Sequence, residues 1–288
     1  MYPIPAVAGR TLTESGAGVI IRPKLAAWVI THNQLQETSV HINLRGRLEP
    51  DTAQVRIGAI GCGSHSFRNL FPVYQFTPTD LVATCDLEVG RAQAYAKQFG
   101  ANSFYTDYRR MIDSEDLDGV VVCVGYDEMG RPMYPQIAAE CMRRGVNVFI
   151  EKPPAGSTED VELMMDASRE GGKILVCGLK RQFFPTTTKA KKLISDGEKF
   201  GRPMLLSLFR EEFIPTVAEM EAWKERGERN KTGGFLDHFC HPASRLLYLF
   251  GMPQRMIYHR ADSGAGFVTF EYDGGPVANM AFTKGGSG

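Results

Sequence analysis

Short apolar runs alternate with segments of helical length between Gln54 and Cys177, and this alternation restricts the fold more than any other feature of the sequence. The apolar runs are Val55–Ile60, Leu81–Cys85, Gly119–Val124, Val146–Ile150 and Ile174–Cys177. Unbroken apolar runs of this length are typical of strands that are buried on both faces of a sheet. The spacing therefore predicts a parallel sheet with helices on both faces, whose strands all end at one ligand-binding edge.

The chain is predicted to contain three parts. Residues 1–53 show weak periodicity and are interpreted as a loosely attached extension or an early start of translation, with an arm docked on a partner subunit as the alternative. Residues 54–179 are predicted to form an α/β domain of the Rossmann type, with a doubly wound parallel sheet. In residues 180–288 the rhythm changes, and Gly266–Tyr272 and Pro276–Phe282 alternate like antiparallel strands. This last part predicts an α+β domain with a largely antiparallel open sheet.

The charge balance excludes several classes of partner. The 33 Lys and Arg residues are matched by 33 Asp and Glu residues, so the chain has no electrostatic footprint for nucleic acid or for an anionic membrane. No apolar run approaches the ~18–20 residues that span a bilayer, and no secretory signal is visible. The six cysteines form no C-x-x-C pair, and Cys85 and Cys123 lie inside apolar runs. We expect a soluble protein of a reducing compartment, the cytoplasm.

A glycine-rich turn follows the first apolar run directly. Its residues, Gly61–Ser66, form a G-x-G-x-x-S pattern that opens the first βαβ unit. Gly61 and Gly63 allow a tight turn and a close approach of the backbone to a pyrophosphate, and the helix that begins near Ser64 offers N–H donors. Ser66 stands where a third glycine is usual, but it is small enough for close packing of helix and strand. The position of the turn predicts dinucleotide binding.

Other candidate cofactor residues lie at the same edge of the predicted sheet. Asp86 follows the second apolar run, where a carboxylate accepts hydrogen bonds from both ribose hydroxyls and repels a 2′-phosphate, so NAD is predicted over NADP. Val124 and Gly125, at the end of the third run, are expected beside the cofactor. His65 is placed either near the cofactor phosphates or ribose or, equally well, at an exposed helix start.

Two further motifs carry side chains suited to acid–base chemistry. Glu151 and Lys152 follow the fourth apolar run, and a lysine held at this edge can donate to a substrate hydroxyl and stabilise a developing alkoxide. Asp237 and His241 lie four residues apart in a helical segment and therefore share one face. Such a pair alone is more often a surface or structural contact, and no metal site is predicted because no third ligand is evident.

Taken together and in this order, the motifs resemble the glucose–fructose oxidoreductase / inositol dehydrogenase / MocA-like (Gfo/Idh/MocA) oxidoreductases. The resemblance rests on Gly61–Gly63, Cys85–Leu87, Tyr105–Tyr108, Glu151–Pro153, Gly178–Pro185, Gly233–Asp237 and His241. It covers residues 54–288 and implies an N-terminal Rossmann domain, a C-terminal α+β domain with a large open sheet, and NAD(P) bound between them. It also implies a small hydroxylated substrate, such as a sugar or polyol.

The resemblance also implies roles for single residues. Lys152 matches the family's catalytic and substrate-orienting lysine, and Asp237 and His241 match its substrate-contacting pair, in which the histidine is commonly the acid/base. Arg181 and Phe183, just past the last parallel strand, are expected near nicotinamide or substrate. Family members usually extend further and complete the C-terminal sheet. The sheet is therefore expected to be incomplete here, and a homo-oligomer is expected to form through it where it is complete.

The expected reaction is reversible hydride transfer between nicotinamide and a secondary alcohol. In this hypothesis His241 removes the hydroxyl proton, Asp237 orients the imidazole or a substrate hydroxyl, and Lys152 donates to the same oxygen, while Glu151 places Lys152 or the nicotinamide ribose. One alternative is NAD-assisted cleavage of a glycoside, which uses the same residues and expels a leaving group. Another is a non-catalytic dinucleotide-binding sensor or an inactive fragment.

Overall fold

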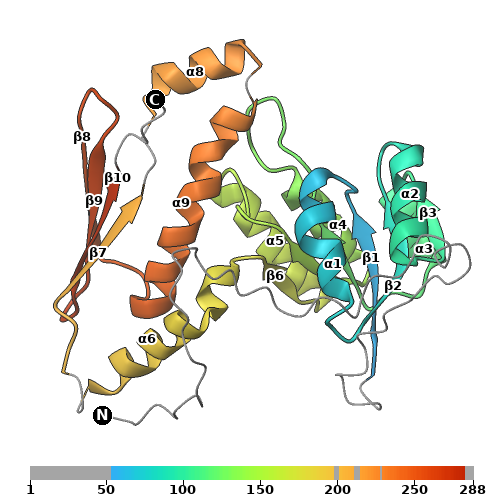
Figure 1. Cartoon of the computed structure of the whole chain (residues 1–288), viewed down its shortest axis with the longest axis horizontal. Helices are drawn as coiled ribbons and strands as arrows, with labels where there is room; N and C mark the ends of the chain where they lie inside the picture. The colour runs from blue at the N-terminus through green and yellow to red at the C-terminus, as the bar shows by residue number, and fades with distance from the viewer. Residues whose placement is uncertain (1–52, 198–200, 211–214, 228, 283–288) are drawn as a thin grey trace, which may run out of the picture. The chain divides into compact units, whose positions relative to one another are not determined.

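The computed structural model describes residues 53–197, 201–210, 215–227 and 229–282 (Figure 1). The predicted N-terminal extension, except for its last residue, lies outside the described residues. Among the described helices, none is both long enough and apolar enough to cross a bilayer.

A six-stranded parallel sheet forms the first part of the fold, as the apolar runs predict. Its strands are β1 (Val55–Ile60), β2 (Thr79–Cys85), β3 (Ser103–Tyr105), β4 (Gly119–Val122), β5 (Asn147–Ile150) and β6 (Leu175–Cys177). They lie in the order β3-β2-β1-β4-β5-β6, so the direction of winding reverses between β1 and β4. Ligands of open α/β sheets bind at such a reversal, outside the carboxyl ends of the strands. Strand β3 is too short and too exposed to have an apolar run of its own.

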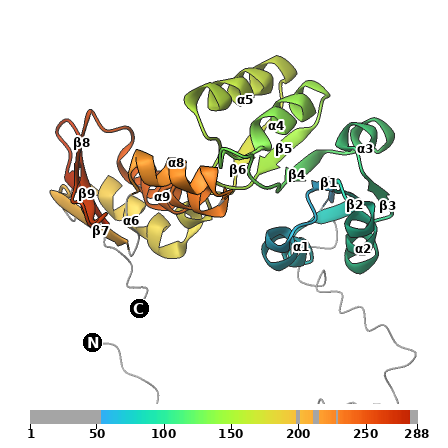
Figure 2. The same ribbon diagram turned by 90° about the horizontal axis from the view of Figure 1, so that it is seen from above.

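Helices cover both faces of this sheet (Figure 2). The π-helix η3 (Ser66–Leu70), α1 (Phe71–Tyr74) and α2 (Val89–Phe99) cover one face, and α3 (Tyr108–Ser114), α4 (Tyr134–Arg143) and α5 (Thr158–Gly171) cover the other. Each face has its own core: Phe71 and Phe99 pack over β1 on the first, and Met142 and Met164 are buried on the second. The doubly wound prediction is therefore confirmed.

Local sequence signals mark the ends of these helices. Helix α2 stops at Gly100, which is left-handed at φ 82° and whose N–H bonds to the Ala96 carbonyl. Helix α5 begins at Ser157, whose side chain accepts from the Asp160 N–H.

The second sheet is mixed but mostly antiparallel. Its strands are β7 (Leu205–Arg210), β8 (Arg255–Arg260), β9 (Gly266–Glu271) and β10 (Val277–Phe282), in the order β7-β10-β9-β8. Strands β8, β9 and β10 pair antiparallel, whereas β7 lies parallel to β10. The β9–β10 hairpin is the one that the alternation predicts. Strand β8 was not predicted, because arginines occupy both of its ends and most of its side chains are exposed.

The second part also contains η4 (Lys180–Phe183), α6 (Pro185–Ser195), α8 (Val217–Glu225) and α9 (Arg229–Phe250). The long helix α9 packs on the inner face of the four-stranded sheet, where Leu246 and Phe239 meet Met280 (Figure 1). It begins at Arg229, and the two glycines in its first turns weaken the helical pattern without ending the helix. The polar segment before it forms α8, which opens with a capping box between Thr216 and Glu219.

Candidate functional site

The glycine-rich turn has the geometry that a dinucleotide-binding loop requires. Gly61 adopts φ +101°, and a Cβ there would lie 2.1 Å from the Cys123 carbonyl oxygen, so only glycine fits. A Cβ on Gly63 would meet nothing within 4 Å, which leaves the backbone open to a ligand. Ser66 is buried, and its hydroxyl donates to the Gly61 carbonyl at 2.8 Å. Serine in place of the third glycine therefore braces the turn instead of obstructing it.

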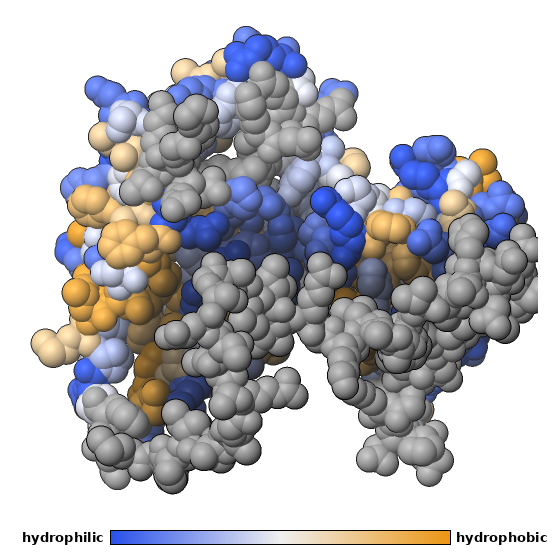
Figure 3. Space-filling view, viewed as in Figure 1, coloured by the Kyte–Doolittle hydropathy of each residue, from blue (hydrophilic) through white to orange (hydrophobic). Residues whose placement is uncertain are grey.

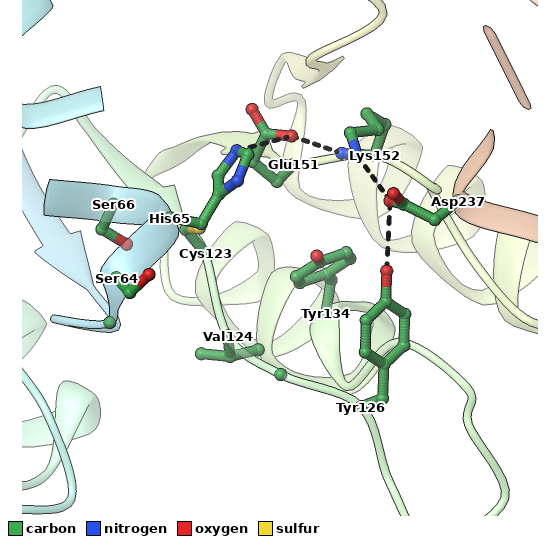
Figure 4. A pocket seen from close by; sticks show the side chains of 12 residues that line it. Ser64, His65, Ser66, Cys123, Val124, Tyr126, Tyr134, Glu151, Lys152 and Asp237 are labelled. Carbon is green, nitrogen blue, oxygen red and sulfur yellow. Dashed lines mark hydrogen bonds and ion pairs between the residues drawn. The ribbon is translucent and has the colours of Figure 1, made fainter. Parts of the chain in front are cut away.

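A pocket of about 400 Å³ opens beside this turn (Figure 4). It is lined by Gly63, Ser64, His65, Ser66, Cys123, Val124, Gly125, Tyr126, Tyr134, Glu151, Lys152 and Asp237. The open backbone at Gly63 and the helix start at Ser64 fit a pyrophosphate, and the polar side chains gather at the other end of the pocket. The residues present thus fit a dinucleotide. Eight of the predicted site residues line one cavity.

Asp86 lies outside the lining and anchors the turn from the end of β2. Its Oδ2 accepts from the Cys62 N–H at 2.9 Å, and its Oδ1 accepts from the Glu88 N–H and from Arg91 at 2.7 Å. Burial alone would raise the pKa of Asp86, but the hydrogen bonds from Arg91 and the two backbone N–H groups outweigh it and lower this pKa. Oδ2 keeps one lone pair for a ribose hydroxyl.

Replacing Asp86 with serine is expected to change the preference between cofactors. The variant loses the ribose acceptor and the negative charge, and it releases the half-exposed Arg91 from its ion pair with Asp86 while the pair with Glu88 remains, so Nη2 of Arg91 can meet a 2′-phosphate. We expect the Kd for NAD to rise about tenfold and the NAD-over-NADP preference to fall by at least about tenfold, ~1.4 kcal/mol. Calorimetric titration of both cofactors measures this, with Asp80→Ser on the same strand as control. An unchanged preference would contradict the assignment.

A continuous chain of polar contacts crosses the pocket (Figure 4). His65 Nε2 lies 3.6 Å from Glu151 Oε2, which also accepts from the Lys152 backbone N–H at 3.1 Å. The Lys152 ammonium contacts Asp237 Oδ1, and the Tyr126 hydroxyl donates to the same oxygen at 3.2 Å. The loop after β5 and helix α9 thus bring the predicted lysine and carboxylate together. Both side chains of this ion pair are largely buried, so solvent screens it weakly.

Sequence reasoning missed Tyr126 and Tyr134. Burial and then the nearby Asp237 carboxylate raise the pKa of Tyr126, so its hydroxyl keeps its proton and remains a donor. Tyr134 lies at the start of α4 and is 4% exposed. Tyr126 comes directly after Gly125, at the switch point between β4 and β1, and that position was the one available signal.

His241 is placed one turn beyond Asp237 but does not line the pocket. Its side chain is 7% exposed, and its Nδ1 has no hydrogen-bond partner among the described residues. Burial, then Arg181 and Lys152, lower the pKa of His241 from 6.5 to about 4, against the opposing effect of Asp237. The imidazole is therefore neutral at pH 7.

The depressed pKa of His241 makes a prediction about acid stability. Between pH 6.5 and pH 4 the unfolded chain binds a proton at this position and the folded chain does not, so the free energy of unfolding falls as pH falls. The loss is at most about 3 kcal/mol. Urea unfolding at pH 7 and pH 4.5 is expected to show a smaller acid loss in His241→Gln than in the wild type. His238→Gln, at an exposed position of the same helix, should behave as the wild type; equal losses in all three proteins would refute the prediction.

The predicted substrate residues on η4 lie outside the pocket lining. Arg181 is partly buried near His241, whose pKa it lowers, whereas Phe183 is 73% exposed. The structure thus brings Lys152 and Asp237 together in the pocket, whereas His241 and Arg181 do not line it.

Known proteins resemble this chain in sequence and fold. A 2,7-anhydro-N-acetylneuraminate hydratase of Mediterraneibacter gnavus is 32% identical over 180 residues, 61% of this chain and 44% of that protein. A myo-inositol 2-dehydrogenase of Thermotoga maritima is 24% identical over 197 residues, 68% of this chain and 55% of that protein. The chain thus spans about half the length of these curated relatives.

Similarity to solved structures extends to the second part of the chain. The WlbA dehydrogenase of Chromobacterium violaceum, solved with NADH and UDP-GlcNAcA, superposes with a TM-score of 0.65 at 21% identity and covers 81% of this chain and 68% of that one. At this identity the likeness establishes the fold. Residues 55–179 also match a family model described as an oxidoreductase family with an NAD-binding Rossmann fold. Residues 55–179 thus form a Rossmann domain of the Gfo/Idh/MocA oxidoreductase family, and this domain is of the NAD-binding kind.

Proposed function

We propose that this chain is an NAD-dependent oxidoreductase that transfers a hydride between nicotinamide and a secondary alcohol of a sugar, a polyol or a similar hydroxylated molecule. The observation that carries the proposal is the Lys152–Asp237 contact inside the pocket that begins at Gly63. An ammonium beside a cofactor site is suited to bind the oxygen of a reacting alcohol. The name of the myo-inositol 2-dehydrogenase relative supports the same substrate class.

In this proposal the protein residues bind and deprotonate the alcohol. Bound NAD supplies the hydride acceptor. Lys152 Nζ donates to the substrate oxygen and stabilises the charge that builds there, while Asp237 holds the ammonium in the pocket. Glu151 fixes the backbone of Lys152 through its N–H. The hydroxyl proton passes to the imidazole of His241, which is neutral at pH 7 and lies one helical turn beyond Asp237.

The direct test of the proposal is turnover. Absorbance of reduced nicotinamide is followed with NAD and a panel of polyols and aldoses, and in reverse with NADH and the corresponding ketones. We expect turnover with at least one member and its loss in His241→Ala with NAD affinity intact. NAD binding without turnover on any member would favour the sensor alternative instead. Release of free sugar from glycosides without net NADH would favour glycoside cleavage.

We also propose that the chain forms a homo-oligomer through the outer face of the four-stranded sheet. Leu205 and Phe209 on β7 are 65% and 76% exposed, and Phe267 and Val277 on the adjoining strands are 45% and 42% exposed. Figure 3 shows apolar side chains gathered over this sheet, at the left of the view. An apolar face of this kind marks a contact surface. Light scattering should give a dimer or larger species for the wild type and a monomer for Phe209→Glu, with Met252→Glu as control; a wild-type monomer would refute the proposal.

The cytoplasmic location remains a prediction. All six cysteines carry free thiols, and Cys62, Cys85 and Cys141 are buried. Burial raises the pKa of each of these three thiols to about 12, so they are unreactive. Free thiols throughout the chain support a reducing compartment.

A further inference from the structure

Helix α9 carries three ionisable side chains in a row on one face: Asp237, His241 and Arg245. The first of them contacts Lys152 in the pocket. Each four-residue step advances about 6 Å along the helix axis, so Arg245 lies about 12 Å beyond Asp237 on the same face. The row therefore leads from the pocket toward the part of α9 that packs on the four-stranded sheet.

Arg181 approaches this row from η4. The neighbouring Gln182 donates through Nε2 to the Ser244 carbonyl at 3.3 Å, which fixes η4 against the turn of α9 that carries Arg245. Burial lowers the pKa of Arg181, and so do Arg210, at the end of β7, and Arg245. Three guanidinium groups from three elements are thus close enough to repel one another.

Within the described part of the chain, no carboxylate balances Arg181 or Arg245. Other arginines of the chain are paired: Arg144 with Asp113 and Glu140, and Arg91 with Asp86 and Glu88. The only carboxylate on the row, Asp237, is engaged by Lys152 and Tyr126.

Buried side-chain nitrogens in the same place also lack partners. Nε of Arg245 and Nδ1 of His241 are both buried without a hydrogen bond to any described residue, and the His241 side chain is 93% buried. An unsatisfied buried polar group destabilises a fold. Such groups persist where a ligand completes them. Positive charge and unpaired buried nitrogens together favour the binding of an anion at this place.

We propose that Arg181 and Arg245 bind an oxyanion, a carboxylate or a phosphate, on the substrate of the proposed reaction. The enzyme then prefers sugar acids or sugar phosphates over neutral polyols. The inference rests on the proposed function, because it assigns the anion to the molecule whose hydroxyl meets Lys152. Guanidinium groups suit this task, since their planar forks bind carboxylate and phosphate through paired hydrogen bonds. The anion lies at the end of the substrate away from the nicotinamide.

The test is calorimetric titration of the full-length protein saturated with NADH. The probes are matched sets: glucose, glucuronate and glucose 6-phosphate, and galactose, galacturonate and galactose 6-phosphate. We expect at least one anionic probe to bind tenfold or more tightly than its neutral parent. Tighter binding of the uronates identifies a carboxylate site, and tighter binding of the phosphates identifies a phosphate site.

Variants locate the site. Arg181→Gln and Arg245→Gln are each expected to remove at least tenfold of the preference for the anion, while the NADH affinity stays unchanged. Arg245→Lys keeps the charge and should retain part of the preference for the anion. This variant shows whether the loss in Arg245→Gln comes from the missing charge or from a folding defect. Arg255→Gln, at an exposed position on β8, is the matched control and should behave as the wild type.

Three outcomes would overturn the inference: equal or tighter binding of the neutral sugars, no binding by any probe, or a preference that survives both glutamine variants. These outcomes differ from failure of the proposed function. Turnover of neutral polyols without a preference for acids would refute the inference alone. Arginine-dependent binding of an anion in a protein that reduces no NAD would refute the oxidoreductase proposal alone.

Discussion

Replacing Lys152 with methionine is expected to lower kcat by about 10²–10³-fold, the usual effect of removing one donor that stabilises a developing oxyanion. Methionine keeps the length and apolar stem of the side chain but supplies neither charge nor proton. The Lys152 ammonium contacts Asp237, and the Lys152 backbone N–H donates to Glu151. The substitution removes the first contact and keeps the second, so the loop stays in place. Single-turnover rates of NADH formation measure the effect.

The affinity for NAD separates a catalytic role of Lys152 from a structural one. Calorimetric titration should give a Kd for NAD within a few-fold of the wild-type value, because the glycine-rich turn lies at the other end of the pocket. Lys97→Met, at an exposed position on α2, is the matched control and should leave kcat unchanged. A Lys152→Met protein with near wild-type kcat would remove this residue from the mechanism.

Replacing Gly61 with alanine is expected to destabilise the fold by about 3 kcal/mol or more. Two effects add: φ of +101° is strained for any residue with a Cβ, and that Cβ would lie 2.1 Å from the Cys123 carbonyl oxygen. The carbonyl belongs to the backbone at the end of β4, so it has little freedom to move. Urea unfolding measures the loss of stability.

Gly63→Ala is the matched control for that prediction. Its Cβ would meet nothing within 4 Å and its φ is not positive, so stability should change by less than about 1 kcal/mol. The new methyl group instead occupies the surface left open for the pyrophosphate, and the Kd for NAD should rise at least tenfold. Equal stability losses in the two variants, or tight NAD binding by Gly63→Ala, would contradict the assigned geometry.

Much of the first domain could be predicted because its determinants are local. Unbroken apolar runs such as Val55–Ile60 indicate strands that are buried on both faces of a sheet. The helix-length segments between these runs indicate that the strands are parallel. Strands β3 and β8 were missed for the opposite reason. They are short or exposed, and pairing with a neighbouring strand, rather than a pattern of their own, makes them strands.

The site could be predicted where a motif marks a strand end, as at Gly61 and Lys152. The Tyr126–Asp237 hydrogen bond joins residues that are 111 positions apart. A contact over this separation cannot be predicted from the spacing of residues in the sequence. The burial of His241 was missed because helical spacing gives the shared face but not what covers it. Arg245 was overlooked although it continues the four-residue spacing of Asp237 and His241.

A double-mutant cycle on kcat tests the central claim most directly, namely that Lys152 and Asp237 act as one unit at the cofactor pocket. The variants are Lys152→Met, Asp237→Asn and the two combined, with NAD affinity measured for each. If the pair acts as a unit, the combined variant is about as slow as the slower single variant. Effects that multiply, so that the combined variant loses the product of the two single losses, would contradict the account.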